Sequence, residues 1–242
     1  MTAIGIIPAR MAASRFPGKP LALLCGRPMI EHVYRRATGA AWLDRVYIAT
    51  PDREIYDAAA KFGATAVMTS PDHARATDRV AEAARGLSGD VVVNIQGDEP
   101  LLNPAALDLL GAAMSADPAL LCANLVNRIT RDEDFHNPNQ IKVVCDCHDN
   151  VLYMSRKPIP SDGDALHVRL RQLGIIAFRR DFLARYAALP PTPLERAESI
   201  DILRAIEHGV RVRAVMSPYD SFGVDTLDDL HAAEASLSGE TR

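Results

Sequence analysis

The first half of the chain alternates short apolar runs with amphipathic patterns, and this alternation limits the possible folds more than any other feature. Short apolar runs between turn residues indicate buried strands, whereas apolar residues with a 3.6-residue period indicate helices. Such an alternation predicts a mostly parallel sheet with helices on both faces, in the α/β class. The predicted strands are residues 4–7, 45–50, 64–68, 90–95 and 120–126, and the predicted helices are 28–38, 52–62, 77–87 and 104–116.

The second half of the chain is less regular. We expect residues 1–242 to form one domain with an inserted, partly antiparallel region at about 130–200. A helix capped by Thr77 or Asp78 is expected at 77–87, and one closed by Gly209 at 195–208. The other strands are predicted at 141–145, 151–154, 173–179 and 210–216, and the other helices at 181–189 and 226–236.

Composition narrows the function classes. A net charge of −4 disfavours nucleic acid as a partner. No apolar run approaches the ~20 residues of a membrane span, and the N-terminus does not resemble a secretion signal. The four cysteines match no zinc-binding spacing and are typical of reduced thiols. We therefore expect a cytoplasmic protein with no membrane partner.

A basic loop follows the first predicted strand. Arg10, Arg15 and Lys19 lie there among Ala, Ser, Pro and Gly residues. Small residues let backbone N–H groups approach phosphates, and the cations neutralise them. The loop contains neither G-x-x-x-x-G-K-[ST] nor G-x-G-x-x-G, so it is neither a Walker loop nor a dinucleotide fingerprint. It predicts a polyphosphate site, with a plain basic surface loop as the alternative.

Two aspartates lie at the same edge of the predicted sheet. Asp98 comes directly after the strand at 90–95, and Asp225 lies between the last strand and the last helix. Ligands of such sheets bind at the carboxyl ends of the strands. Each aspartate alone is typical of a helix cap or a turn. Together with the basic loop, the pair predicts Mg²⁺ bound to a polyphosphate.

Several longer motifs resemble one family. The chain is similar to the cytidylyltransferases that make CMP-Kdo, the activated sugar acid of lipopolysaccharide, along essentially its whole length and in the family's order. This resemblance implies a nucleotide-binding, Rossmann-like sheet, CTP and an acidic small molecule as substrates, Mg²⁺ as cofactor and a homodimer. The motifs are IGIIPARMAASRFPGKPL, VVNIQGDEPLL, FHNPNQIKVV, YMSRKPIP, LGIIAFRRDFL and PLERAE followed by LR.

The resemblance also implies roles for individual residues. Asp98 and Asp225 would bind the metal and, with Arg10 and Lys19, form the catalytic group. The CTP-binding residues would be Pro8, Ala9, Arg10, Ser14, Arg15, Lys19, His73, Arg75, Thr77, Arg79 and Gln96. The acceptor-binding residues would be Gln96, Gln140, Lys142, Arg156, Gln172 and Asp201.

The chain departs from the family's pattern where that pattern contacts the sugar acid. Gln172 replaces a His, Ile176 a Tyr, and Asp201-Ile202 a Glu-Gln pair. Arg75 adds a cation in place of a Ser. Each buried sugar hydroxyl that loses a partner weakens discrimination by roughly 1–3 kcal/mol. The departures favour a compact anion, so the sequence predicts transfer of CMP to a small phosphonate such as phosphonoformate.

Two alternatives remain at this point. The departures could be drift within an ordinary CMP-Kdo synthetase. The chain could also be a nucleotide-binding protein without turnover, although the retained Asp98, Asp225 and Lys19 argue against that.

Overall fold

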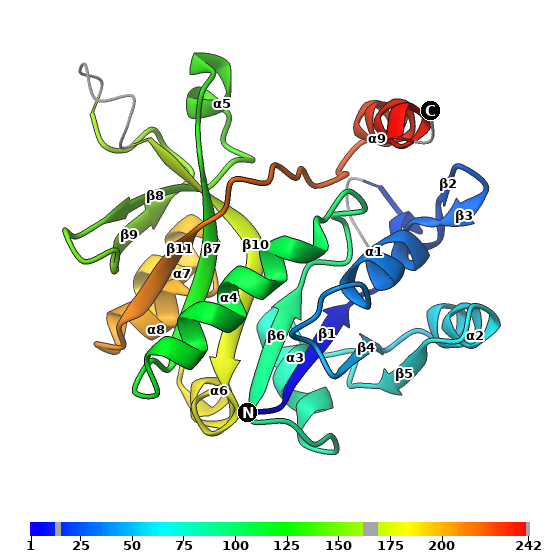
Figure 1. The fold of residues 1–242 in the computed structure, drawn as a ribbon, viewed down its shortest axis with the longest axis horizontal. Coiled ribbons are helices and arrows are strands. Elements are labelled where there is room, and N and C mark those ends of the chain that lie inside the picture. Colours follow the sequence, from blue (N-terminus) through cyan, green and yellow to red (C-terminus); the bar gives the residue numbers. More distant parts are fainter. Residues whose placement is uncertain (13–15, 162–168, 241–242) are drawn as a thin grey trace.

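A computed structural model describes residues 1–12, 16–161 and 169–240, and it contains one large sheet with helices around it (Figure 1). The sheet has nine strands, and its main path runs β11-β7-β10-β6-β1-β4-β5. The strands on this path are β1 (Ala3–Pro8), β4 (Arg45–Thr50), β5 (Thr65–Met68), β6 (Val91–Ile95), β7 (Cys122–Arg128), β10 (Leu170–Arg179) and β11 (Val212–Met216).

Most strand pairs in this path are parallel. Strand β1 pairs in parallel with β4 and β6, and β7 pairs in parallel with β11. The long strand β10 runs antiparallel between β6 and β7. Its first residues also pair with β8 (Lys142–Cys145), which forms a hairpin with β9 (Val151–Ser155). The α/β class with a mostly parallel sheet and an antiparallel arm is thus confirmed, whereas the division into one domain stays a prediction.

Helices cover both faces of the sheet. Along β1, Ala3 and Ile7 join one buried core, while Ile4 and Ile6 join the other, because side chains alternate along a strand. Full burial of one such aliphatic side chain contributes roughly 1.5–3 kcal/mol. The first core contains residues of α1 (Met29–Ala37), α2 (Arg53–Lys61) and α4 (Pro104–Ala116), and the second contains residues of α3 (Ala76–Ala84), α6 (Arg180–Ala188) and α8 (Leu203–Glu207).

The single helix predicted at 195–208 is wrong. The structure has α7 (Pro193–Glu198) and then α8, with Ser199 between them in the left-handed conformation at φ 55°. A capping box between Thr192 and Glu195 starts α7 before the predicted position. The predicted cap of α3 is also wrong, since Arg75 occupies that position and makes no side-chain cap.

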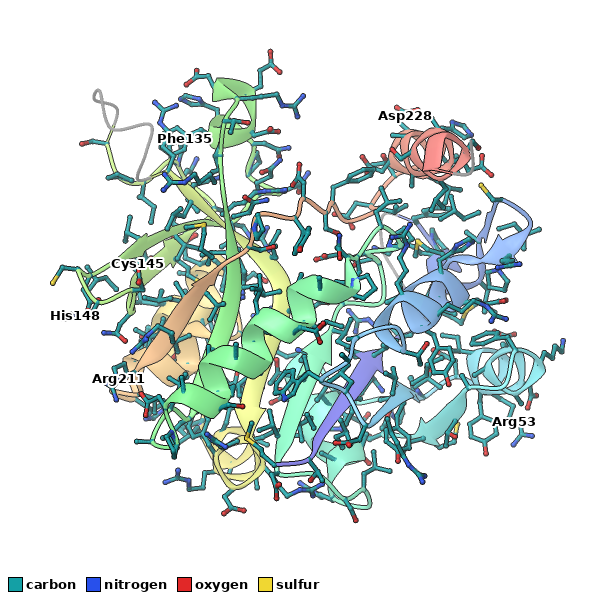
Figure 2. All side chains as sticks on the ribbon, in the orientation of Figure 1. Arg53, Phe135, Cys145, His148, Arg211 and Asp228 are labelled. Carbon is teal, nitrogen blue, oxygen red and sulfur yellow. The ribbon has the colours of Figure 1, made fainter. Side chains whose placement is uncertain are left out.

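Two further helices flank the carboxyl edge of the parallel strands. The short α5 (Asp132–His136) and the C-terminal α9 (Leu227–Glu240) lie on opposite sides of the upper part of the molecule. Figure 2 labels Phe135 on the former and Asp228 on the latter. A small ribbon of β2 (Leu23–Leu24) and β3 (Arg27–Pro28) precedes α1. Within residues 1–12, 16–161 and 169–240, no helix combines the length and apolarity needed to cross a membrane.

Candidate active site

Two adjoining cavities open where β1 and β6 end. The smaller has a volume of about 290 Å³ and the larger about 860 Å³. Residues that line both cavities form their common wall: Ala74, Arg75, Ala76, Gln96, Asp98 and Asp225. A reaction between two substrates, one in each cavity, would therefore take place beside Asp98 and Asp225.

The smaller cavity forms where the chain leaves β1 and β6. Pro8, Ala9 and Arg10 continue from β1, and Gln96 and Gly97 continue from β6. A Cβ atom on Gly97 would lie only 2.9 Å from the carbonyl oxygen of Pro8. Glycine at this position thus allows the two segments to pack closely and to expose backbone groups to the cavity.

Cationic side chains outnumber carboxylates around the smaller cavity: Arg10, Lys19, Arg75 and Arg79 face Asp98 and Asp225. The Arg79 side chain is buried and donates from Nη1 to Thr69 Oγ1 at 2.6 Å. Burial lowers the pKa of Arg79, and the positive charge of Arg10 lowers it further. Positive charges that oppose one another in this way indicate a site for an anion.

Lys19 lies between the two aspartates. Its Nζ donates to Asp98 Oδ2 at 2.7 Å and to Asp225 Oδ1 at 3.0 Å. Burial alone would lower the pKa of Lys19, but the charges and hydrogen bonds of both aspartates outweigh burial and raise it. Two carboxylates from distant parts of the chain thus converge on one positive charge.

The pair Asp98 and Asp225 is the candidate binding site for a metal ion. The described residues contain no group of three His, Cys, Asp or Glu side chains arranged to hold a metal. Mg²⁺ usually takes one or two carboxylates together with substrate phosphates and water. Asp98 and Asp225, which already share one cation, fit a Mg²⁺ ion whose other ligands come from a nucleotide.

The larger cavity has a polar lining that mixes both charges. It is formed by the ends of β7 and β10, the turn after α5, the break between α7 and α8, and the segment before α9. The lining includes both arginines and carboxylates, and Arg131 and Arg171 are paired with Asp134 and Asp220. The other polar side chains that could contact a ligand include Gln140, Gln172, Asn137, Asn139, Thr130, Ser199 and Ser221.

The structure brings most of the predicted acceptor residues to the larger cavity. Gln96, Gln140, Arg156, Gln172 and Asp201 line it, although their contacts with an acceptor stay predictions.

Lys142 is placed elsewhere. Its side chain is fully buried, and its Nζ donates to the carbonyl oxygens of Asn137, Gln140 and Arg156 at 2.8, 2.6 and 2.8 Å. Burial lowers the pKa of Lys142, and nearby Arg156 lowers it further. The ammonium group ties two cavity segments together and does not itself line the cavity.

The residues that depart from the family pattern lie in different parts of the structure. Gln172 and Ile176 line the larger cavity, but Ile202 is 1% exposed and belongs to the hydrophobic core. The expectation that Ile202 removes a polar contact from the acceptor pocket is therefore wrong. Arg75 lines both cavities, yet its Nη1 donates to Ser199 Oγ at 2.8 Å and its Nε lies 3.7 Å from Glu195 Oε1. Part of its added charge is thus already balanced.

The predicted CTP residues fall into three groups. Thr77 is buried beside the cavity, where its hydroxyl donates to Asp201 Oδ2 at 2.5 Å and accepts from Asn94 Nδ2 at 3.1 Å. Ser14 and Arg15 lie outside the described residues. The remaining residues line the smaller cavity: Pro8, Ala9, Arg10, Lys19, His73, Arg75, Arg79 and Gln96.

The sequence interpretation missed several cavity residues. Glu99 is 7% exposed and lines the larger cavity directly beside Asp98. Burial raises the pKa of Glu99, and the charge of Asp98 raises it further. Arg171 contributes next to Gln172, and Phe16 lines the smaller cavity. Glu99 lies within the motif VVNIQGDEPLL, and Arg171 adjoins Gln172, so motif membership and adjacency were the available signals.

Comparisons with known proteins agree with this arrangement. A sequence family described as cytidylyltransferase matches residues 4–212. A relative from Syntrophobacter fumaroxidans, named 3-deoxy-manno-octulosonate cytidylyltransferase, is 48% identical and the match covers 98% of each chain. A relative of the same name from Trichlorobacter lovleyi is 42% identical, with 98% of this chain and 99% of that protein covered.

Solved structures extend the comparison. A structure described as CMP:2-keto-3-deoxy-manno-octonic acid synthetase complexed with CTP is 39% identical and superposes with a TM-score of 0.93. That match covers 99% of this chain and 100% of the other. A 4-diphosphocytidyl-2C-methyl-D-erythritol synthase from Anaerococcus prevotii is 14% identical with a TM-score of 0.66, over 98% of this chain and 96% of the other, so it shares the fold alone.

Proposed function

Because the chain belongs to the CMP-Kdo synthetase family and is a CTP-dependent cytidylyltransferase, we propose that it transfers CMP to 3-deoxy-manno-octulosonate (Kdo). The observation that carries this proposal is the larger cavity, whose volume is about 860 Å³ and whose lining mixes arginines with carboxylates and amides. An acid with several hydroxyl groups offers an anion to the arginines and donors to the carboxylates and amides. The names of the curated relatives support the same acceptor.

The small phosphonate expected from the sequence departures receives less support. An ionised phosphonate has only hydrogen-bond acceptors, so it would offer no donor to the carboxylates of the larger cavity. One of the departures, Ile202, lies in the core, and Arg75 is already paired with Glu195. Phosphonoformate therefore becomes the rival acceptor in the test below.

On the nucleotide side, we propose that the smaller cavity holds CTP. Arg10, Lys19 and Arg79 would neutralise the triphosphate, and Pro8, Ala9 and His73 would lie beside the cytidine. His73 Nε2 lies 2.5 Å from Glu82 Oε2, so the ring is already oriented before a ligand binds. Ser14 and Arg15 remain predicted triphosphate residues.

Mg²⁺ would be held by Asp98 and Asp225, together with nucleotide phosphates. When bound, such an ion neutralises phosphate charge and polarises the phosphorus centre. Lys19 bridges the same two carboxylates through hydrogen bonds of 2.7 and 3.0 Å, which fixes their orientation relative to both cavities.

The proposed reaction is an in-line displacement at the α-phosphorus. A hydroxyl oxygen of the acceptor forms a bond to that phosphorus, the bond to the β-phosphate breaks, and the acceptor hydroxyl loses its proton to solvent. Pyrophosphate leaves with the extra negative charge. Arg10 and Lys19 would stabilise this developing charge, because cations placed in advance around a leaving phosphate lower the barrier.

Pyrophosphate release tests this function directly. We expect release with CTP, Mg²⁺ and Kdo, and a much lower kcat/KM with phosphonoformate or with UTP, ATP or GTP. Release with phosphonoformate but not with Kdo would favour the phosphonate acceptor. Tight CTP binding without pyrophosphate release with any acid would favour a nucleotide-binding protein without turnover.

The homodimer also stays a prediction, and sedimentation velocity checks it.

A further inference from the structure

Glu99 has an unusual environment for a buried carboxylate. Its side chain is 7% exposed, and Oε1 accepts a hydrogen bond from the backbone N–H of Gly174 at 3.0 Å. Its second oxygen, Oε2, has no hydrogen-bond partner among the described residues, although Glu99 lines the larger cavity. A buried carboxylate oxygen normally finds a partner, so an unpartnered one at a cavity wall points to a ligand that supplies a donor.

The backbone around Gly174 holds this carboxylate in place. The pairing of β10 with β7 shifts register between Gln172 and Ile176, and Gly174 in this stretch lies against the segment after β6. A Cβ atom on Gly174 would lie 2.8 Å from Glu99 Oε1 and 2.3 Å from Gln96 Cγ. Glycine therefore leaves the space that the Glu99 carboxylate occupies.

Two polar side chains lie beside the Glu99 carboxylate. A hydrogen bond from Ser221 and the positive charge of Arg171 both favour the charged form of Glu99, although the geometry of Ser221 Oγ falls short of a regular hydrogen bond. Arg171 is held by Asp220 and by the carbonyl oxygen of Ser221 at 3.0 Å. Both neighbours line the same cavity, so a ligand there would meet an acceptor, a hydroxyl and a guanidinium together.

We propose that Glu99 Oε2 accepts a hydrogen bond from a hydroxyl group of the acceptor and thereby selects hydroxylated acids. This inference rests on the proposed function, because it assigns a further residue to the acceptor half of the same site. The N–H of Gly174 already donates to Oε1, so Oε2 is the oxygen left for a ligand. A phosphonate without a hydroxyl group gains nothing from this contact.

Glu99→Gln is the test variant. Its amide oxygen can still accept from Gly174, but its NH₂ group then replaces Oε2 and cannot accept a hydroxyl proton. We expect kcat/KM for Kdo to fall about 10- to 100-fold while KM for CTP changes less than about twofold. Glu133→Gln, at an exposed position on α5, is the matched control and should behave as wild type.

A series of Kdo analogues, each lacking one hydroxyl group, separates a direct contact from a structural role. For the analogue that lacks the contacted hydroxyl, we expect the wild-type kcat/KM to fall by the same factor as Glu99→Gln lowers kcat/KM for Kdo. The kcat/KM of the variant should not fall any further with this analogue. Equal losses for every analogue, or unchanged kcat/KM for Kdo in the variant, would overturn the inference. If the variant does not fold, the wild-type series decides, and the inference fails when no single hydroxyl matters. Absence of wild-type turnover with Kdo would instead overturn the proposed function, and this inference with it.

Discussion

The two halves of the site are built in different ways. The smaller cavity is formed mainly by four short segments, namely the ends of β1 and β6 and residues 16–20 and 73–79, so each motif in the sequence supplies neighbouring side chains. The larger cavity is assembled from the arm, β10, the α7–α8 break and the segment before α9. Many of its polar side chains already hold other parts of the protein, as Arg156 does through Glu198 and Pro138.

This difference shows where residue type indicates function. Near β1 and β6, a cation or carboxylate after a strand lies at the cavity because the parallel sheet delivers it there. Around the larger cavity a cation can instead hold segments of the protein together, as Lys142 does. Substitutions in the two halves should therefore have different effects, and the largest is expected at the wall that both cavities share.

The first prediction concerns the wall shared by both cavities. Asp98→Asn and Asp225→Asn should each lower kcat by at least about 1000-fold, because several kcal/mol of charge stabilisation depend on these carboxylates. The side chains are 30% and 29% exposed, so the fold should persist. Pyrophosphate release and circular dichroism provide the two measurements.

Asp228→Asn is the control for this pair, since Asp228 is exposed at the start of α9 (Figure 2). Turnover near the wild-type rate in either Asp98→Asn or Asp225→Asn would remove the metal assignment and the meeting point of the two cavities.

The second prediction concerns Glu195, which ties α7 to α8. Its carboxylate accepts from Arg204 at 2.7 and 2.8 Å, and both side chains are almost fully buried. Glu195→Gln should lower the free energy of unfolding by about 2–3 kcal/mol at neutral pH, because the buried guanidinium of Arg204 loses one of its two carboxylate partners and keeps only Asp78. It should also release Arg75 from its ion pair with Glu195 and weaken acceptor binding. Urea denaturation measures the stability effect.

The pH dependence of this effect has a definite sign. Burial alone would raise the pKa of Glu195, but hydrogen bonds from Arg204 and the Thr192 backbone outweigh burial and lower the pKa below its ordinary 4.5. Glu195 therefore stabilises the fold above pH 4.5, and this stabilisation is lost as the pH falls through the lowered value. The stability gap between wild type and Glu195→Gln should shrink in that acidic range; a gap that stays constant would contradict the account.

The third prediction treats Lys142 as a positioning residue. Lys142→Met leaves three half-buried carbonyl oxygens without their shared donor, so we expect a loss of about 2 kcal/mol in the free energy of unfolding. KM for the acceptor should rise while KM for CTP stays near its wild-type value, since the displaced segments line only the larger cavity. Lys61→Met, on exposed α2 surface, is the control. Equal changes in both KM values would show that the two halves are not separable in this way.

The smallest effect is expected from Ile202→Gln, which restores a residue of the family pattern. Ile202 is 1% exposed in the core, so a buried amide there should cost about 1–2 kcal/mol of stability. We expect no gain in kcat/KM for Kdo, because the side chain does not line the cavity. Improved use of Kdo would mean that position 202 does reach the acceptor.

The same contrast explains how much the sequence could predict. The parallel core could be predicted from hydrophobic periodicity, and the residues after β1 and β6 from motifs, because both signals lie in the local sequence. Ser199 ends α7 by a left-handed turn that the periodic pattern of 195–208 does not encode. Lys142, Thr77 and Ile202 look like ligand or departure positions in the sequence, but in the structure Lys142 and Thr77 bond to other protein groups and Ile202 lies in the core.

A crystal structure with CTP and a Kdo analogue that lacks the attacking hydroxyl would show which cavity holds each substrate. The account predicts cytidine and the triphosphate in the smaller cavity, the sugar acid in the larger one, and the α-phosphate beside Asp98 and Asp225. An acceptor bound outside the larger cavity, or a nucleotide whose α-phosphate lies away from these two carboxylates, would contradict it.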